Sequence, residues 1–230
     1  KEYGLVERAM VSFSIAASNI EDRSYALFGG YNSSQIVGGS AGLKTFKNTD
    51  ELAHLGLARL GYVDDGHYIT DLTKSYPAII DTGNSELSVP PEVFTNSLSL
   101  AQVSAKSRFK DKVTFCYVRE PCESVVKKVK PVSFQMSDYI FEIDPDEYLL
   151  VASKNKCFFV IHRTDLGDNE GEQSNIFMIG DLFLKHFYSV YDLDRDEVAL
   201  GVNTHSAKTV RIRSPNYDLY LSLAGFWGFG

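Results

Sequence analysis

The chain has no uninterrupted apolar run of the roughly 20 residues that a membrane-spanning helix needs. The nearest approach is the stretch 219–230 (LYLSLAGFWGFG), which is too short by this measure. There is also no excess of positive charge, because 30 acidic residues outnumber 23 basic ones and leave a formal net charge of −7. A field of that sign repels phosphate backbones. The sequence therefore predicts no membrane-spanning helix and no nucleic-acid partner.

Cysteine is scarce and histidine is scattered. There are three cysteines (Cys116, Cys122 and Cys157) and five histidines, with no H-E-x-x-H motif and no pair of C-x-x-C motifs. Metal sites use those spacings, so no metal is expected. An odd number of cysteines leaves one thiol free or paired with another chain.

What the chain does contain is the balance of an ordinary globular protein, with 44% hydrophobic and 23% charged residues in 230. That length is enough for one large domain or two small ones. Short alternating or apolar runs between turn residues predict an all-β fold with a few short helices. The expected strands are 11–17, 25–28, 78–80 (buried on both faces), 132–136, 139–143, 148–152, 157–161 and 176–179, followed by a closing hairpin of 188–192 and 198–202. A helix is expected from Pro90 to about Val103, a short helical turn at 182–187, and surface loops at 44–52 and 163–174.

One short motif suggests a serine nucleophile. Residues 38–42 (GGSAG) fit the G-x-S-x-G elbow of serine hydrolases, which needs an apolar strand before it and a helix after it. The polar lead-in at 33–37 and the exit at 43–46 meet neither requirement. We therefore interpret this segment as a flexible glycine-rich turn.

A second motif is more specific in its context. An apolar run, 78–80, delivers Asp81 onto a tight turn with Thr82, Gly83, Asn84 and Ser85. Gly83 permits close backbone approach, and the two hydroxyl side chains can form local hydrogen bonds. Alone, an Asp-Thr-Gly triplet is common enough to mark an ordinary turn at the end of a strand.

Ninety-five residues beyond Asp81, the segment 176–181 (IFMIGD) is followed by LFLKHFYSVYD and then by VALG. With the Asp-Thr-Gly turn, this order resembles the C-terminal half of the pepsin-like aspartic proteases. The early segments 4–6 and 28–30 and the later segment 131–134 fit the same pattern. The resemblance covers residues 1–203, which it identifies as a C-terminal lobe of the pepsin-like acid protease fold. Residues 204–230 fall outside it as a C-terminal extension.

The resemblance implies an aspartic endopeptidase in which Asp81 is one of two catalytic aspartates. The partner aspartate belongs to an N-terminal half that is not in this sequence. Thr82 would lock the two turns together, while Gly83, Asn84 and Ser85 would line the cleft that binds the peptide substrate. Asp181 would be structural. No metal and no organic cofactor is implied.

Two other readings stay open. A catalytically inactive relative could keep the fold as a binding or assembly module, and the residue facing Asp81 would separate this from the enzyme. A retroviral-type homodimer is a third option, although its protomers are much shorter. The chain also departs from the family pattern, with Asn84 where a Thr or Ser is usual, a longer 44–67 region, no second Asp-Thr-Gly and no flap hairpin.

The family pattern further implies a disulfide from Cys157 to either Cys122 or Cys116, and with it the secretory pathway, secreted or lysosomal/vacuolar. Asn32 begins the Asn-Ser-Ser glycosylation sequon and is expected in an exposed turn. Residues 204–230 are expected to pack outside the protease-like core. They would either cover the edge left by the absent half or lead into a membrane anchor, since an apolar cluster needs a partner: Leu219, Leu221, Leu223, Phe226, Trp227 and Phe229.

Overall fold

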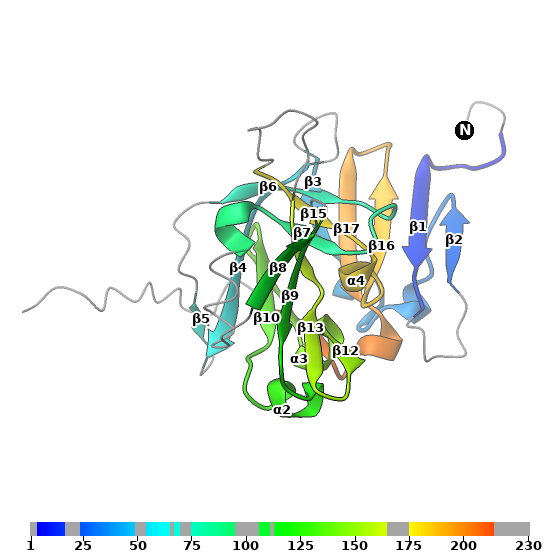
Figure 1. Cartoon of the computed structure of the whole chain (residues 1–230). Helices are drawn as coiled ribbons and strands as arrows, with labels where there is room; N and C mark the ends of the chain where they lie inside the picture. Colours follow the sequence, from blue (N-terminus) through cyan, green and yellow to red (C-terminus); the bar gives the residue numbers. More distant parts are fainter. Residues whose placement is uncertain are drawn as a thin grey trace, which may run out of the picture.

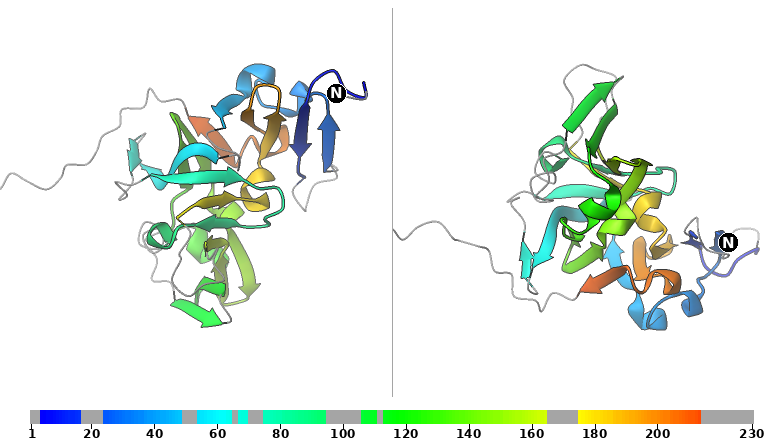
Figure 2. Two further views of the ribbon diagram at one scale, coloured as in Figure 1. Left: turned by 90° about the horizontal axis from the view of Figure 1, so that it is seen from above. Right: turned by 60° about the horizontal axis from the view of Figure 1, so that its bottom comes forward.

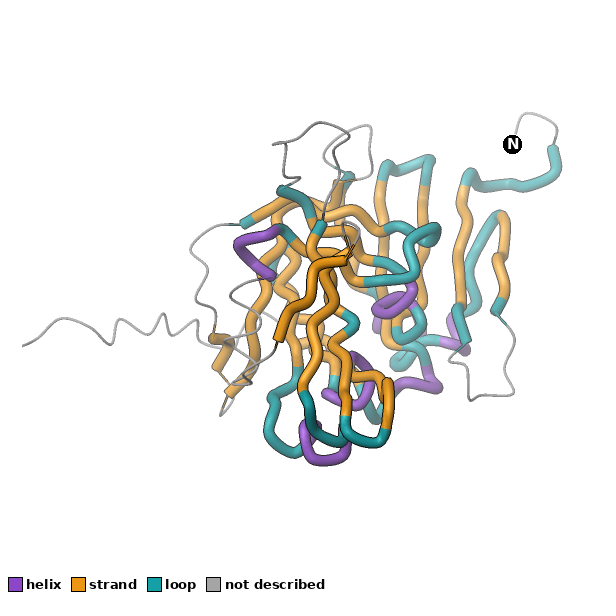
Figure 3. Tube along the Cα trace, in the orientation of Figure 1, coloured by secondary structure: helices purple, strands orange, loops and turns teal. Residues whose placement is uncertain are grey.

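The computed structural model is built almost entirely from β-strands, arranged in three sheets (Figures 1 and 3). It describes residues 4–16, 24–48, 54–64, 67–69, 75–94, 106–110, 113–164 and 175–213. The helices are short: η1 (Ser33–Gln35), η2 (Gly39–Gly42), α2 (Cys122–Val126), α3 (Pro145–Tyr148), α4 (Asp181–Leu184) and η3 (Thr204–Ser206), and residues 91–94 are also helical. The expected all-β fold with a few short helices is confirmed.

The largest sheet has nine strands. Its order is β14 (Ile161–Arg163), β7 (Leu87–Val89), β15 (Phe177–Ile179), β6 (Tyr76–Ile80), β4 (His54–Asp64), β10 (Val132–Met136), β11 (Tyr139–Ile143) and β18 (Val210–Arg213), with β5 (His67–Ile69) paired to β4. Most neighbours are antiparallel, but β15 runs parallel to β6 and β14 runs parallel to β7.

Two smaller sheets complete the fold. One has the order β2 (Tyr25–Phe28), β1 (Met10–Ser14), β16 (Phe187–Asp192), β17 (Glu197–Val202) and β3 (Lys44–Lys47), and the other has the order β12 (Leu149–Ser153), β13 (Lys156–Phe159), β9 (Val113–Val118) and β8 (Lys106–Lys110). Both views of Figure 2 place the β2–β1 hairpin and the four-stranded sheet on opposite sides of the strands β6, β15 and β7.

The core is held together by aromatic rings from strands and a short helix that are distant in the sequence. Phe134, Phe141, Phe177, Phe183 and Phe187 are all fully buried. Phe183 and Phe187 stack with ring centroids 4.3 Å apart, and Phe134 meets Phe177 edge-on at 5.8 Å. Edge-to-face and offset pairs of this kind stabilise a core beyond the area that they bury. These rings connect α4, β15 and the β10–β11 hairpin into one cluster.

Most predicted strands are confirmed with shifted ends, but the loop at 44–52 is wrong in its first half. Lys44–Lys47 forms β3, which pairs with β17 at the edge of the five-stranded sheet. Only Phe46 of this strand is buried, so the sequence lacks the run of apolar residues that predicts a strand. Residues 49–53 lie outside the described part of the chain.

Other boundaries also differ. The prediction that 78–80 is buried on both faces is wrong, because Tyr76–Ile80 alternates and Ile79 is only half-buried. The helix at Pro90 is confirmed for residues 91–94, and its predicted continuation lies outside the described residues. The predicted helical turn at 182–187 is α4, which ends at Leu184. The predicted loop 163–174 is wrong at Arg163, which ends β14, and most of the rest is not described.

Residues 38–42 form a short 3₁₀ turn followed by the strand β3 rather than by a helix, in agreement with a glycine-rich turn. Asn32 is exposed at the start of η1, as predicted, and its Oδ1 accepts hydrogen bonds from the N–H and the hydroxyl of Ser34.

Cys157 is bonded to Cys122, so the disulfide is confirmed and Cys116 is not its partner.

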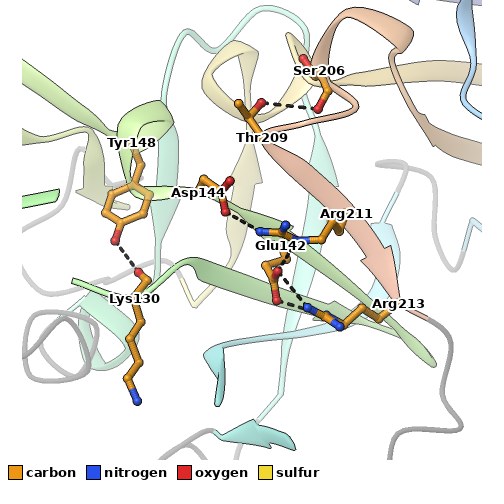
Figure 4. Close-up of polar contacts among 8 residues, drawn as sticks. All are labelled: Lys130, Glu142, Asp144, Tyr148, Ser206, Thr209, Arg211 and Arg213. Carbon is orange, nitrogen blue, oxygen red and sulfur yellow. Dashed lines mark hydrogen bonds and ion pairs between the residues drawn. The ribbon is translucent and has the colours of Figure 1, made fainter. Parts of the chain in front are cut away.

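Residues 204–213 do not pack outside the core, so the expectation for the C-terminal extension is wrong for this part. β18 pairs with β11 as the last strand of the nine-stranded sheet, and Val210 is 1% exposed within the main core. Figure 4 shows the charged contacts that hold it: Glu142 accepts from Arg211 Nε at 2.6 Å and from Arg213 at 3.1 and 3.2 Å. Residues 214–230, with the apolar cluster, lie outside the described residues. Within the described ranges, no helix is long and apolar enough to cross a membrane.

Candidate active site

The Asp81 turn lies where β6 ends and the chain turns back into β7. These two strands are not neighbours, because β15 lies between them, parallel to β6 and antiparallel to β7. Ile179 is paired with Ile80 on one side and with Leu87 on the other. The end of β15 is therefore placed between the two arms of the turn.

Backbone hydrogen bonds fix the turn from both sides. The N–H of Asp81 donates to Ile179 O at 3.0 Å, and the N–H of Asn84 donates to Asp81 O at 3.2 Å. The N–H of Gly83 donates to Asp81 Oδ1 at 2.9 Å, which orients the carboxylate over its own turn. Asp81 is half-buried, while Thr82, Gly83 and Ser85 are exposed. The carboxylate is thus held in place and accessible to water.

Gly180 closes the other side of the turn. Its N–H donates to Glu86 O at 2.9 Å, and the N–H of Asp181 donates to Asn84 O at 2.7 Å. A Cβ atom at Gly180 would lie 2.0 Å from Asn84 O and 2.4 Å from Glu86 O. Both are backbone atoms that cannot rotate away, so only glycine fits where β15 comes this close to the backbone of the turn.

Asn84 uses its side chain to brace the turn. Its Oδ1 accepts from the N–H of Glu86 at 3.2 Å, and its Nδ2 donates to Met178 O at 3.5 Å. The contacts of this amide therefore go to the backbone of β15 and of the chain entering β7. Neither of these side-chain hydrogen bonds goes to the Asp81 carboxylate.

The charge of Asp81 reaches two neighbouring groups. Burial raises the pKa of Asp181, at the start of α4, and the negative charge of Asp81 raises it further. The pKa of the Tyr191 hydroxyl is also raised, mainly by burial, with a further contribution from Asp81. Sequence reasoning placed Asp181 in a structural role and did not single out Tyr191, which carries no local motif.

A histidine–glutamate pair beside the turn was also missed. His162 Nδ1 lies 2.8 Å from Glu86 Oε2, and the histidine is 7% exposed. Burial lowers the pKa of His162, while Glu86 acts in the opposite direction. The two residues are 76 positions apart and meet only because β14 pairs with β7, so no spacing in the sequence could have revealed them.

Chemically, the site offers one oriented carboxylate on a rigid turn. Among the residues that the structure describes, no three His, Cys, Asp or Glu side chains are grouped as metal ligands would be. A carboxylate held on such a turn can act as a base when ionised and as an acid when protonated.

An all-β lobe that presents an Asp-Thr-Gly turn between two strands, with a third strand inserted between them, has the fold of a pepsin-like acid protease. The chain belongs to the eukaryotic aspartyl protease family, whose sequence model matches residues 1–203.

Individual relatives agree with this assignment. The chain is 26% identical to vacuolar protease A of Neurospora crassa over 209 residues, and 24% identical to gastricsin of Cavia porcellus over 199 residues. Each match covers 86% of this chain but only 46% of the relative, so the chain spans about half the length of these relatives. Its fold is similar to that of the aspartic proteinase from Irpex lacteus, with a TM-score of 0.68 and 17% identity over 90% of this chain and 60% of that one.

Proposed function

We propose that this chain is the C-terminal lobe of an aspartic endopeptidase and that Asp81 is one of its two catalytic aspartates. The observation that carries the proposal is the Asp81 turn, in which a water-accessible carboxylate is oriented by Gly83 and fixed by the backbone of β15. A turn built this rigidly suits a residue that must keep its position while a substrate binds.

The chemistry requires a second carboxylate. Peptide hydrolysis without a nucleophilic side chain needs a base that takes a proton from water and an acid that polarises the carbonyl. Two carboxylates that share one proton perform both roles, whereas one carboxylate cannot. The partner aspartate is therefore assigned to an N-terminal half of the same protease.

Two observations support a missing half. The chain spans 46% of the length of the two relatives compared above. In addition, β2 is an edge strand whose Leu27 and Phe28 are 38% and 71% exposed, and Leu5 of the N-terminal segment is 85% exposed. An open strand edge with exposed apolar side chains is the kind of surface that another sheet covers.

The remaining residues of the turn would bind substrate. Gly83, Asn84 and Ser85 would line one wall of the cleft and pair with an extended peptide through strand-like hydrogen bonds, and Thr82 would reach the opposing turn. The side chain of Asn84 already bonds to Glu86 and Met178, and its backbone N–H and carbonyl bond to Asp81 and Asp181. Asn84 would therefore form part of the wall of the cleft, and the strand-like hydrogen bonds to substrate would come from Gly83 and Ser85.

The alternative is a catalytically inactive relative that acts as a binding or assembly module. Asn84 favours this alternative, because the family pattern has a Thr or Ser at this position and the Asn84 amide bonds to the backbone instead. The residue that faces Asp81 in the N-terminal half separates the two functions.

For its location, we propose the secretory pathway, with a secreted or a lysosomal/vacuolar destination. The supporting observations are the Cys122–Cys157 disulfide and the names of the relatives, vacuolar protease A and gastricsin.

The test is complementation. The 230-residue chain is assayed alone and together with its upstream half against a denatured protein at about pH 3–5, where a carboxylate pair holds one proton. We expect cleavage, sensitive to the aspartic-protease inhibitor pepstatin, only when both halves are present. Cleavage by the chain alone would contradict the requirement for a partner carboxylate. A correctly assembled pair that cleaves nothing would favour the binding module.

A further inference from the structure

A basic surface lies at one end of the molecule, formed by α2 with the residues on either side of it and by the β12–β13 hairpin. We call it the basic end and define it as residues 119–130 and 150–158. It carries six basic residues against two acidic ones, although the whole chain has a net charge of −7. In Figure 1, α2 and the turn of the β12–β13 hairpin lie together at the bottom of the molecule.

The disulfide holds these two segments in one place. Cys122 at the start of α2 is bonded to Cys157 in β13, with Cα atoms 4.8 Å apart. Lys127 and Lys128 then follow at the end of α2, and Lys154 occupies the tip of the hairpin, all three exposed. The disulfide therefore holds the two lysine-bearing segments close together, with Lys128 also paired to Glu120 of its own segment.

Two aliphatic side chains protrude from the same hairpin. Leu150 is 53% exposed and Val151 is 72% exposed, which are high values for such residues next to a core. They are consecutive on a strand, so they point to opposite faces of the sheet. A folded partner packed against one face would cover only one of them. A fluid layer that the edge of the hairpin enters would cover both.

The edge of β12 is poorly suited to pairing with another strand. β12 ends its sheet, and its register against β13 shifts between Val151 and Ser153. A bulge of this kind twists an edge strand and interrupts the regular ladder that an added strand would need. The backbone thus disfavours an acidic peptide that extends the sheet.

We propose that the basic end binds the surface of a lipid bilayer that contains anionic lipids. Its lysines contact the lipid headgroups, and Leu150 and Val151 enter the boundary between headgroups and acyl chains. The unpaired backbone groups of the β12 edge stay at the hydrated headgroup level, where water satisfies them. This proposal does not depend on the proposed protease activity.

The experiment is co-sedimentation of the 230-residue chain with vesicles of phosphatidylcholine, with and without about 30% phosphatidylserine. One variant combines Lys127→Glu with Lys154→Glu, and a second combines Leu150→Ser with Val151→Ser. Matched controls are Lys208→Glu and Leu193→Ser, which change an exposed lysine and a leucine that is 72% exposed, both outside the basic end. All six substitutions in these four variants lie at the surface, and circular dichroism checks the fold.

We expect binding that requires phosphatidylserine and weakens with salt. The lysine variant should lose roughly tenfold or more in affinity, the apolar variant several-fold, and the controls should bind like the original chain. Binding that is equal on both vesicle types, or that the basic-end variants leave unchanged, would overturn the proposal, because another segment would then be responsible. Absence of binding would overturn it too. Binding of an acidic polypeptide such as polyglutamate, without vesicle binding, would assign the surface to a protein partner instead.

Discussion

The Asp81 turn and the β18 edge of the same sheet are held in place by different means. At the turn, the contacts are backbone hydrogen bonds. The main-chain N–H groups of Asp81, Gly180 and Asp181 all donate to carbonyls of the opposing segment. At the β18 edge, pairing with β11 is reinforced by side-chain charge, with Glu142 between two arginines. The turn is therefore sensitive to added atoms, whereas the β18 edge is sensitive to removed charge.

The largest effect is expected from Gly180→Ala, which tests the first half of this comparison. The new Cβ would lie 2.0 Å from Asn84 O, so the strand β15 and the turn must separate. We expect a loss of at least about 3 kcal/mol in the free energy of unfolding, or failure to fold. Urea denaturation measures this.

The matched control is Gly30→Ala. A Cβ at Gly30 has no neighbour within 4 Å, so its effect should stay within about 0.5 kcal/mol. Equal effects of the two alanines would show that close approach at Gly180 does not fix the turn.

Glu142→Gln tests the second half. The Glu142 side chain is 3% exposed, and the change leaves Arg211 and Arg213 facing a neutral amide. Because the arginines are 44% and 25% exposed, water compensates in part, and we expect a loss of about 2–3 kcal/mol in unfolding free energy. The control is Glu120→Gln, which breaks the exposed pair with Lys128 and should leave stability unchanged within error. A Glu142 variant as stable as its parent would mean that backbone pairing alone holds β18.

His186 connects the two regions and makes their stability depend on pH. It follows α4, is 1% exposed, and its Nδ1 lies 3.0 Å from Ser206 Oγ in η3, which leads to β18. Glu147 lies 3.3 Å from its Nε2. Burial, together with the charges of Lys185 and His205, lowers the pKa of His186 to about 3.

Since its unfolded pKa is about 6.5, the unfolded chain takes up the proton first as the pH falls. Stability from this group is therefore complete above pH 7 and decreases through acid down to about pH 3. We expect a loss of about 2 kcal/mol between pH 7 and 5. His186→Gln should flatten this part of the profile of unfolding free energy against pH, with pH 8 as the internal reference. An unchanged slope would assign the acid sensitivity to other groups.

The sequence was sufficient where structure follows from local pattern. The apolar run before Asp81 predicted a strand leading into a turn, and the resemblance predicted the disulfide of Cys157. Both predictions are confirmed. The turn depends on residues close in the sequence, and the disulfide depends on a cysteine spacing that the family pattern supplies. The position of Asp81 could thus be predicted, although its role as a catalytic residue stays a prediction.

The features that could not be predicted from the sequence depend on pairing between strands that are distant along the chain. Lys44–Lys47 reads as a polar loop, and only its position beside β17 makes it a strand. β18 lies beyond the residues that match the family model, and the role of its arginines follows only from their contacts with Glu142 on β11. The side chain of Asn84 likewise forms hydrogen bonds with Met178 and Glu86, because β15 lies between the arms of the turn.

The catalytic role of Asp81 is tested most directly by the activity of the assembled two-half protein with Asp81→Asn, compared with Asp181→Asn. Asparagine keeps the size of the side chain but cannot share a proton as a carboxylate does. We expect Asp81→Asn to lower the rate of acid proteolysis by at least about 10³-fold with the fold intact, since it removes a group that acts as base and acid. Asp181→Asn, at the start of α4, should retain most of the activity. Full activity of the Asp81 variant, or equal losses in both variants, would contradict the assignment of Asp81 as a catalytic aspartate.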